Sequence, residues 1–190
     1  MRFRAVLAVG MALAAGACSR ADAVRNGVAT DEGIAAIALP EEQYRSMLER
    51  GSFGTMSGPM YLATLGQKEG CDVLDEAVEK EVKRNLPQWR ANLIAAYRDN
   101  VPADRLAEAV QKSPRRARSM LEPYVPAIGS AMKAASGPLL RNSGVEVLSA
   151  MGDAAGKVDR ASLDLQARER DLAEIKRTRK ICGVGLWQQQ

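Results

Sequence analysis

The chain has 190 residues, with 27 Lys and Arg against 23 Asp and Glu, and it contains no histidine. The small basic excess, to which Arg2 and Arg4 of the N-terminal segment contribute, argues against nucleic acid as a partner. Without histidine the chain lacks the usual general base near neutral pH, the commonest metal ligand and every histidine-activated nucleophile. Composition therefore favours a non-enzymatic protein without a cofactor.

Residues 1–17 have the pattern of a signal peptide. A positive start is followed by an apolar stretch over residues 6–15, too short for a permanent membrane span, and then by small residues. Cys18 comes directly after them, which resembles the bacterial lipobox, whose cysteine is diacylated. We expect cleavage before Cys18 and lipidation there; the alternative is plain secretion, with cleavage after Ala17 or Ala23.

The next segment, residues 18–29, is short, polar and patternless, which predicts a flexible tether. Ser19 beside Cys18 resembles the sorting pattern for the outer membrane. The expected location is the periplasmic side of the cell envelope, as an outer-membrane lipoprotein or otherwise as a soluble periplasmic protein. Beyond the signal, no apolar run is long enough for a second membrane span.

Apolar residues at helical spacing predict an all-helical domain over residues 30–182. A first helix begins at Thr30, and a second opens at Pro40 and stops at Gly51. The glycines that recur over residues 51–70 predict a loop with at most one helical turn.

A long amphipathic helix follows, kinked or restarted at Pro87. Its predicted apolar stripe is Cys71, Leu74, Val78, Val82, Leu86, Trp89, Leu93 and Tyr97. Pro102 starts the next helix, and Ser113 with Pro114 ends it. The segment from Met120 to Leu139 has helical spacing but contains prolines that interrupt or kink it.

The last long helix is predicted over residues 143–178, and residues 183–190 form a C-terminal tail that contains Trp187. The inward stripe predicted for this helix is Val145, Leu148, Met151, Ala155, Val158, Leu165, Leu172 and Ile175. No useful stretch alternates with period two, so strands are not expected. The predicted architecture is an irregular bundle of about five to seven helices with one long-range disulfide.

That disulfide joins Cys71 to Cys182, the cysteines that remain after Cys18. An even pair in an oxidising compartment predicts a bond, and the alternative is two independent thiols. The bond would clamp the C-terminal end of the chain to the first long helix. No C-x-x-C motif is present, so thiol exchange is not supported.

Residues 86–140 carry a helix with Trp89 that ends near Tyr97, a short break at residues 100–102, and a helix with Leu106. A Ser-Pro break at Ser113 and a Met-bearing helix follow. This order resembles the bacterial envelope family called domain of unknown function 2059, over under a third of the chain. The family has an aromatic before its Ser-Pro and a glycine after it, whereas this chain has Val110, Gln111, Lys112, then Arg115 and Arg116. The resemblance implies an exported helical domain and brings no catalytic motif.

Two sequence patterns resemble functional sites, one catalytic and one metal-binding. Ser130 and Lys133 spell the S-x-x-K box of penicillin-recognising enzymes, but the S-D-N and K-T-G elements are absent, so we interpret the match as coincidence. Four carboxylates, Asp72, Asp75, Glu76 and Glu79, would suit a divalent cation, yet a solvated helix face interleaved with lysines is the preferred interpretation. We therefore predict no catalytic, cofactor-binding or metal-binding residues.

Other patterns concern binding. Two basic clusters, one at Arg115, Arg116 and Arg118 and one over residues 176–180, would suit anionic lipid headgroups or an acidic partner, or are solvated surfaces. Gly152 and Gly156 permit close helix packing inside the bundle. Six methionines fill the core or line an apolar groove: Met47, Met56, Met60, Met120, Met132 and Met151.

The leading hypothesis is a lipid-anchored, non-enzymatic periplasmic domain that binds or scaffolds another envelope protein or the membrane lipid surface. The alternative is a periplasmic carrier that holds a lipid or another apolar ligand in a Met-lined groove. A hydrolase that uses Ser130 with Lys133 is a third and weaker hypothesis.

Overall fold

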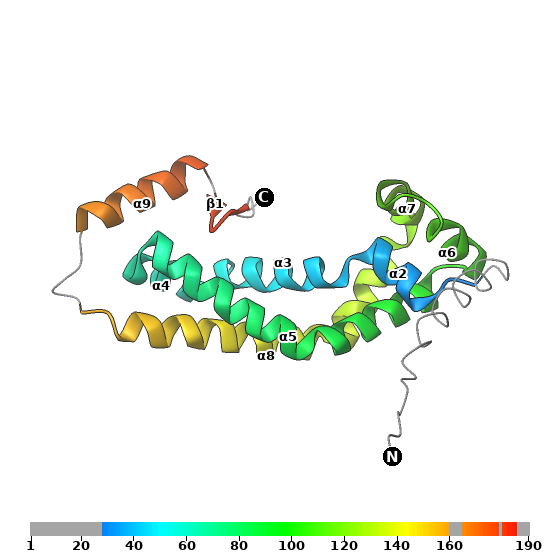
Figure 1. Cartoon of the computed structure of the whole chain (residues 1–190), viewed down its shortest axis with the longest axis horizontal. Coiled ribbons are helices and arrows are strands. Elements are labelled where there is room, and N and C mark those ends of the chain that lie inside the picture. Colours follow the sequence, from blue (N-terminus) through cyan, green and yellow to red (C-terminus); the bar gives the residue numbers. More distant parts are fainter. Residues whose placement is uncertain (1–27, 160–164, 179, 186–190) are drawn as a thin grey trace, which may run out of the picture.

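The computed structural model describes residues 28–159, 165–178 and 180–185 of the chain. This part is helical apart from one small hairpin, and the predicted all-helical bundle is confirmed (Figure 1). The helices are, in chain order, α2 (Asp31–Ala38), α3 (Pro40–Phe53), α4 (Ser57–Leu65), α5 (Gln67–Asn100), α6 (Ala103–Ala109), α7 (Pro114–Leu121), the 3-10 turn η1 (Glu122–Tyr124), α8 (Val125–Gly156) and α9 (Leu165–Thr178).

The first two helices begin where the sequence predicts. Thr30 caps α2, since its Oγ1 accepts a hydrogen bond from the Gly33 N–H at 3.1 Å. Leu39 ends α2 in the left-handed conformation with φ of 53°, and Pro40 opens α3 directly. A proline disfavours helical backbone in the residue before it, so Pro40 sets the break. α3 then continues past the stop predicted at Gly51.

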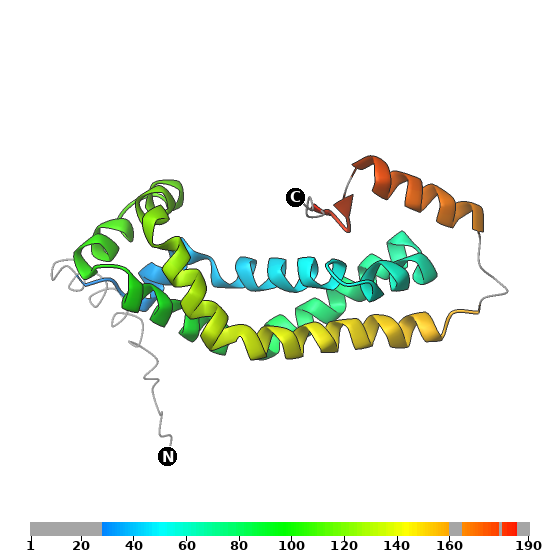
Figure 2. The same cartoon turned by 180° about the vertical axis from the view of Figure 1, so that it is seen from behind.

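Three helices, α3, α5 and α8, lie side by side along the long axis of the molecule (Figures 1 and 2). The predicted stripe of α5 is confirmed at its centre, where five members are buried: Leu74, Val78, Val82, Trp89 and Leu93. Pro87 lies inside α5 without ending it. The helix changes direction near its middle (Figure 1), so the proline is accommodated by a bend.

The loop predicted over residues 51–70 is wrong, because α4 fills much of it. Two of its glycines are sites of close helix contact. A Cβ added to Gly58 would overlap the carbonyl of Ser52, and one added to Gly70 would overlap the side chain of Leu62. These glycines serve tight packing between helices and not a flexible connection.

The single helix predicted over residues 143–178 is also wrong. α8 already begins at Val125 and ends at Gly156, and α9 is a separate helix. Pro126 lies in the first turn of α8, where its missing N–H costs nothing, and α8 continues through Pro138. Gly156 is a poor helix former and lies where α8 ends.

The buried side of α8 differs from the predicted stripe as well. Val147 is fully buried, whereas Val145 is 65% exposed. The inward positions recur four and seven residues apart, and two of them are Ser136 and Ser143. The predicted stripe is therefore right at Met151, which is fully buried, but it misses Ser136, Ser143 and Val147, since serine does not mark an apolar stripe.

The two buried serines of α8 take part in hydrogen bonds with α3 and α5. Tyr44 and Ser143 share a hydrogen bond of 2.7 Å, and Asn85 Nδ2 donates to Ser143 Oγ at 3.0 Å. The same amide donates to Glu81 Oε2 at 3.0 Å, and Arg84 pairs with that buried carboxylate at 2.9 Å. This chain of satisfied polar groups fixes the register of the three long helices.

A short hairpin follows α9. β1 (Lys180–Ile181) pairs antiparallel with β2 (Val184–Gly185). The two residues between the strands, Cys182 and Gly183, have φ of 50° and 76°, as a type I′ turn requires. Strands this short carry no period-two signal, and β2 lies in the segment predicted as a tail.

Candidate functional site

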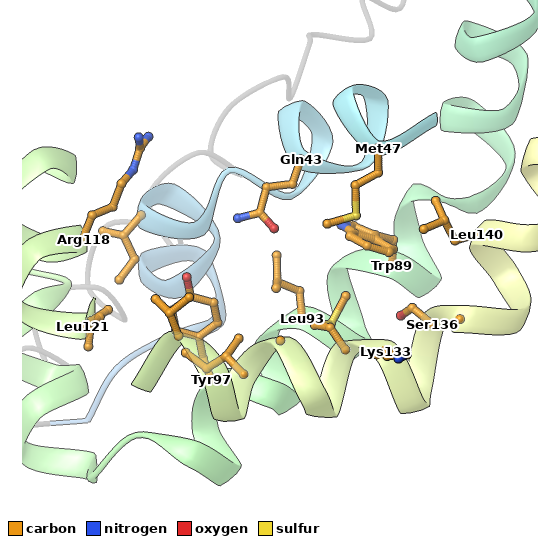
Figure 3. A pocket seen from close by; sticks show the side chains of 16 residues that line it. Gln43, Met47, Trp89, Leu93, Tyr97, Arg118, Leu121, Lys133, Ser136 and Leu140 are labelled. Carbon is orange, nitrogen blue, oxygen red and sulfur yellow. The ribbon is translucent and has the colours of Figure 1, made fainter. Parts of the chain in front are cut away.

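The most favourable candidate site is an apolar groove along the first half of α8, which we call the α8 groove. Its volume is about 580 Å³. α2, α3, α5, α7 and α8 form its walls (Figure 3). The lining residues are Ile37, Gln43, Met47, Trp89, Leu93, Tyr97, Arg118, Leu121, Val125, Ile128, Gly129, Met132, Lys133, Ser136, Gly137 and Leu140.

The groove is long and mostly apolar. On α8 its lining residues run from Val125 to Leu140, which corresponds to about 22 Å at the helical rise of 1.5 Å per residue. Met47 and Val125 are 44% and 56% exposed although both are apolar. Leu93 and Ile128 are buried beneath them. The side chains that a ligand would cover are therefore in place and open to solvent.

Trp89 is the largest buried side chain in the lining, with 2% of its surface exposed. Its ring stacks on Tyr44, with centroids 4.9 Å apart and an interplanar angle of 29°. The hydroxyl of Tyr44 shares a hydrogen bond with Ser143, so the polar group of this ring has a partner. The Trp89 Nε1–H, in contrast, finds no acceptor among the described residues. A buried donor without an acceptor costs about 1 to 3 kcal/mol, so an oxygen supplied from outside would stabilise the site.

The charges in the groove are of one sign. Arg118 of α7 and Lys133 of α8 line it, and the lining contains no carboxylate. Tyr97 of α5 also lines the groove. Burial raises the pKa of Tyr97 and the Arg118 guanidinium lowers it in part, with a net increase. The phenol is therefore neutral at physiological pH, and the groove carries positive charge.

Two other polar side chains of the lining, Gln43 and Ser136, are engaged within the protein, whereas the Tyr97 hydroxyl forms no hydrogen bond with a described residue. Gln43 Nε2 donates to the Ala38 carbonyl at 2.7 Å, and Ser136 Oγ accepts from Asn92 Nδ2 at 2.9 Å. In Figure 3 Gln43 and Met47 reach from α3 toward the groove. Tyr97, Arg118 and Lys133 thus provide donors that a ligand can use, and the Trp89 N–H adds a further donor once the side chains that enclose it move.

A second hollow lies on the other side of α3, with a volume of about 570 Å³. Glu32, Glu41 and Glu42 line it together with Arg45 and Arg90. Its charges of both signs favour internal pairing; Arg90, for example, lies 3.9 Å from Glu32. This hollow is a weaker candidate, since it offers a ligand less apolar surface than the α8 groove does.

Three of the four carboxylates considered for a cation, Asp72, Asp75 and Glu79, have protein partners. Lys68 bonds Asp72 at 2.8 Å, and Arg45 pairs with Asp75 at 3.6 Å and with Glu79. The hydrogen bond from Arg45, followed by the one from Lys83, lowers the pKa of Glu79. In the part of the chain that the structure describes, no group of three or more acidic or cysteine side chains is arranged to hold a metal.

The S-x-x-K pair lies on the exposed surface of α8. The Ser130 hydroxyl donates to the Pro126 carbonyl of its own helix at 3.0 Å. Lys133 is an exposed residue that also lines the α8 groove. The sequence had singled out Lys133 for a different chemistry, so its place in the groove was not predicted.

The two basic clusters differ in their neighbours and in their position relative to the α8 groove. Arg115, Arg116 and Arg118 are all exposed on α7, and Arg118 alone among them lines the groove. In the second cluster Arg177 makes two hydrogen bonds to Glu174, at 2.7 and 2.9 Å. Its member at position 179 lies outside the described residues. The first cluster is therefore the one that adjoins the candidate site.

The methionines do not together line a groove. Met47 and Met132 are the two that reach the α8 groove, while Met151 is fully buried and Met56 and Met60 are exposed. The groove is therefore aliphatic and aromatic where a Met-lined one was predicted.

The glycine pair of α8 serves packing at one position. A Cβ on Gly152 would lie 3.2 Å from the ring and hydroxyl of Tyr61, whereas one on Gly156 would meet nothing within 4 Å. Gly152 therefore lets α4 approach α8, as predicted for internal packing, and Gly156 makes no such contact.

The predicted disulfide is present, with Cys71 and Cys182 joined at 2.03 Å across 111 residues. It ties the first turns of α5 to the turn of the hairpin. Two side chains of α9 hold the same region. Asp171 Oδ2 accepts from the Gln67 N–H at the start of α5 at 2.9 Å, and Arg168 Nη1 donates to the Ala63 carbonyl near the end of α4 at 2.6 Å. We call α4, the start of α5, α9 and the hairpin the clamped end.

The signal peptide over residues 1–17, Cys18, most of the tether and Trp187 lie outside the described residues. Ala29, the last residue of the predicted tether, is buried, and its carbonyl accepts a hydrogen bond from Arg98 Nη2 at 3.2 Å. Among the helices that the structure describes, none has the length and apolar character needed to span a membrane.

Comparison of the chain with protein-family models, with curated proteins and with solved structures finds no match. The resemblance noted over residues 86–140 therefore remains a prediction. The site has to be interpreted from its own geometry. That geometry is a long apolar groove with two cations and one buried N–H that lacks an acceptor.

Proposed function

We propose that this chain is an exported, non-enzymatic protein of the cell envelope, whose helical domain binds an apolar ligand in the α8 groove. The N-terminal signal pattern supports export. The Cys71–Cys182 bond is of the kind that persists in oxidising compartments. The protein thus acts as a carrier or a receptor for its ligand.

The α8 groove is the observation that carries the proposal. Its volume of about 580 Å³ is within the range of sites for small molecules. Met47 and Val125 expose apolar surface to water, and each Å² of such surface costs about 25 cal/mol of free energy. A ligand that covers these side chains recovers that free energy, which is the physical basis for binding.

We propose no catalytic step for this domain. The chain contains no histidine. The Ser130 hydroxyl donates a hydrogen bond to the Pro126 carbonyl of its own helix. Lys133 lines the groove, and the described lining contains no carboxylate that could act as a base. These groups support binding rather than bond cleavage.

A scaffold that docks on another envelope protein or on the membrane lipid surface is the second candidate. Arg115 and Arg116, both exposed on α7, favour it. A basic residue near an anionic membrane contributes about 1 kcal/mol, so these residues alone would bind such a surface weakly. A lipid on Cys18 would strengthen this contact.

Native mass spectrometry of the mature protein purified from the periplasm without detergent tests the ligand proposal. We expect a population heavier than the polypeptide, which loses a small apolar molecule on collisional activation. Protein that carries no ligand from the cell and binds no fatty acid, fatty alcohol or lysolipid in vitro would contradict the proposal.

Two matched variants locate the ligand. Gly129 lines the groove and Gly144 does not, yet a Cβ at either position meets nothing within 4 Å. Gly129→Phe places a ring in the groove and should abolish the heavier population. Gly144→Phe makes the same change elsewhere on α8 and should leave it intact. Equal loss in both variants would place the ligand outside the groove.

Metabolic labelling with a palmitate analogue tests the anchor. We expect the natural protein to take up label and the Cys18→Ser variant to take up none. Label that persists in Cys18→Ser would refute lipidation at this residue, and absence of label in both would favour plain secretion.

A further inference from the structure

We infer that the ligand of the α8 groove is an anionic amphiphile with a single acyl chain, attracted by the positive charges of Arg118 and Lys133 at opposite ends of the groove (Figure 3) and able to accept a hydrogen bond from the Trp89 N–H. This inference rests on the proposed function and specifies the chemistry of its ligand. Long-chain fatty acid is the occupant to which we commit.

The shape of the groove indicates one extended chain. Its lining on α8 follows the helix for about 22 Å, from Val125 to Leu140. Leu93, Ile128 and Met132 are buried apolar residues of the lining, along which a hydrocarbon chain can lie. A volume of about 580 Å³ suits one small amphiphile and not a diacyl lipid with its headgroup.

The charge of the groove indicates an anionic headgroup. Arg118 and Lys133 come from different helices and line the same space. Neither side chain forms an ion pair with a described residue, in contrast to Arg45 or Arg84, which do. With no carboxylate in the lining, the electrostatic potential favours a negative ligand over a neutral or positive one of the same chain length.

Trp89 supplies the second, independent observation. Its N–H is buried and has no acceptor among the described residues, although the ring lines the groove. Protein interiors leave few donors unpaired, and an unpaired donor in a pocket points to an acceptor on the ligand. A carboxylate oxygen, or an ester oxygen close to the headgroup, would fill that role.

Three probes of equal chain length distinguish the proposed function, which is binding of an apolar ligand, from the further inference that the ligand is anionic. Hexadecanoate, hexadecanol and hexadecylamine are titrated into the mature protein by calorimetry, below their aggregation limits and at mildly alkaline pH, where the acid is ionised. We expect hexadecanoate to bind at least tenfold more tightly than hexadecanol, and hexadecylamine to bind most weakly. The preference should fall as salt is added.

If none of the three probes binds, the proposed function itself fails. If all three bind equally, the groove is an apolar site and only the inference about charge is overturned. The two failures are therefore distinguishable in one experiment.

The cations are tested by a matched pair of double variants. Arg118→Gln with Lys133→Gln removes two charges from the groove and should bring hexadecanoate to the affinity of hexadecanol. Arg115→Gln with Arg116→Gln removes two charges from the exposed surface of α7 outside the lining and should keep the preference within twofold. An equal loss in both double variants would overturn the assignment, since net charge alone would then explain it.

The hydrogen bond proposed for the Trp89 N–H can be tested without a substitution of Trp89 itself. In a Trp187→Phe background Trp89 is the remaining tryptophan, so its indole N–H gives one resolved ¹⁵N–¹H resonance. We expect hexadecanoate to shift this resonance downfield, as a new hydrogen bond does, and hexadecanol to shift it less. Binding that leaves the resonance unmoved would overturn the role of the indole. Trp89→Phe should lower the affinity for hexadecanoate about tenfold.

Discussion

The two ends of this bundle are stabilised by different means. At the clamped end a disulfide, Asp171 on the start of α5 and Arg168 on the end of α4 hold the elements together. At the other end the α8 groove leaves apolar side chains open, and Trp89 has no acceptor within the part of the chain that the structure describes. The comparison teaches that stability is concentrated away from the place where a ligand can be received. A site that keeps unsatisfied groups can be tolerated because the rest of the fold offsets its cost.

The largest effect is expected from the disulfide. Cys71→Ser with Cys182→Ser frees a loop of 111 residues. On the chain-entropy argument the free energy of unfolding falls by about 4 to 5 kcal/mol, measured by urea denaturation. Reductant should have the same effect on the natural protein and none on the double variant. A midpoint that does not move would show that the clamped end does not depend on its covalent bond.

A pair of methionines on α8 compares the two ends directly. Met151 is fully buried near α4, and Met132 is buried at the base of the groove. Met151→Ala should cost about 3 kcal/mol of unfolding free energy, because a closed core cannot fill the cavity. Met132→Ala should cost about half as much, since its site already opens to solvent. Equal losses would mean that the groove is packed as tightly as the core.

A smaller effect is expected where α9 meets α5. Asp171→Asn weakens the acceptor for the Gln67 N–H and removes a negative charge from a helix N-terminus. The free energy of unfolding should fall by about 1 kcal/mol. Glu169→Gln removes the same charge from an exposed position of α9 and should change it by a few tenths. The prediction fails if the two variants are equally stable.

The smallest effect concerns pH at the groove end. Burial raises the pKa of Tyr97 above its usual value of 10.0, and Arg118 opposes this in part. Because the folded pKa is the higher one, the stability contributed by the neutral phenol is complete below about pH 10 and is lost as the pH rises through the folded value. Tyr97→Phe should lessen the decline in unfolding free energy above pH 10. An unchanged decline would assign it to other groups, such as Tyr44, whose pKa burial also raises.

Much of the fold follows from local signals in the sequence. Thr30, Pro40 and Pro102 mark helix starts that the structure confirms, and the stripe of α5 is regular enough to predict its buried side. The disulfide followed from counting cysteines. The helix starts and the stripe depend on residues that are close together in the sequence. The disulfide depends on the rule that paired cysteines oxidise in an oxidising compartment.

The errors have long-range causes. Gly58 and Gly70 look like loop residues, but they are contact points whose partners, Ser52 and Leu62, lie in neighbouring helices. Ser143 faces inward because Tyr44 and Asn85 satisfy its hydroxyl. No pattern along the chain reveals such a partner, so polar residues that the fold makes into core residues escape a search for apolar stripes.

The candidate site could be predicted in its parts but not as a whole. Trp89, Leu93 and Met132 were each expected to be apolar helix positions. Arg118 was considered for contact with anionic lipid headgroups in a basic cluster, whereas Lys133 was considered as part of an S-x-x-K box. What makes them a groove is the space left where α3 and α8 separate. That space depends on the packing of whole helices and leaves no signal in the sequence.

The position of Cys182 has a consequence for biosynthesis. Nearly every residue of the bundle is synthesised before the second sulfur of the bond exists, since Cys182 follows α2 to α9 in the chain. The crosslink therefore cannot close until the sequence of every helix from α2 to α9 has been synthesised. Chains cut short by premature termination would keep a reactive thiol at Cys71, and a quality-control oxidoreductase could tell them from finished molecules.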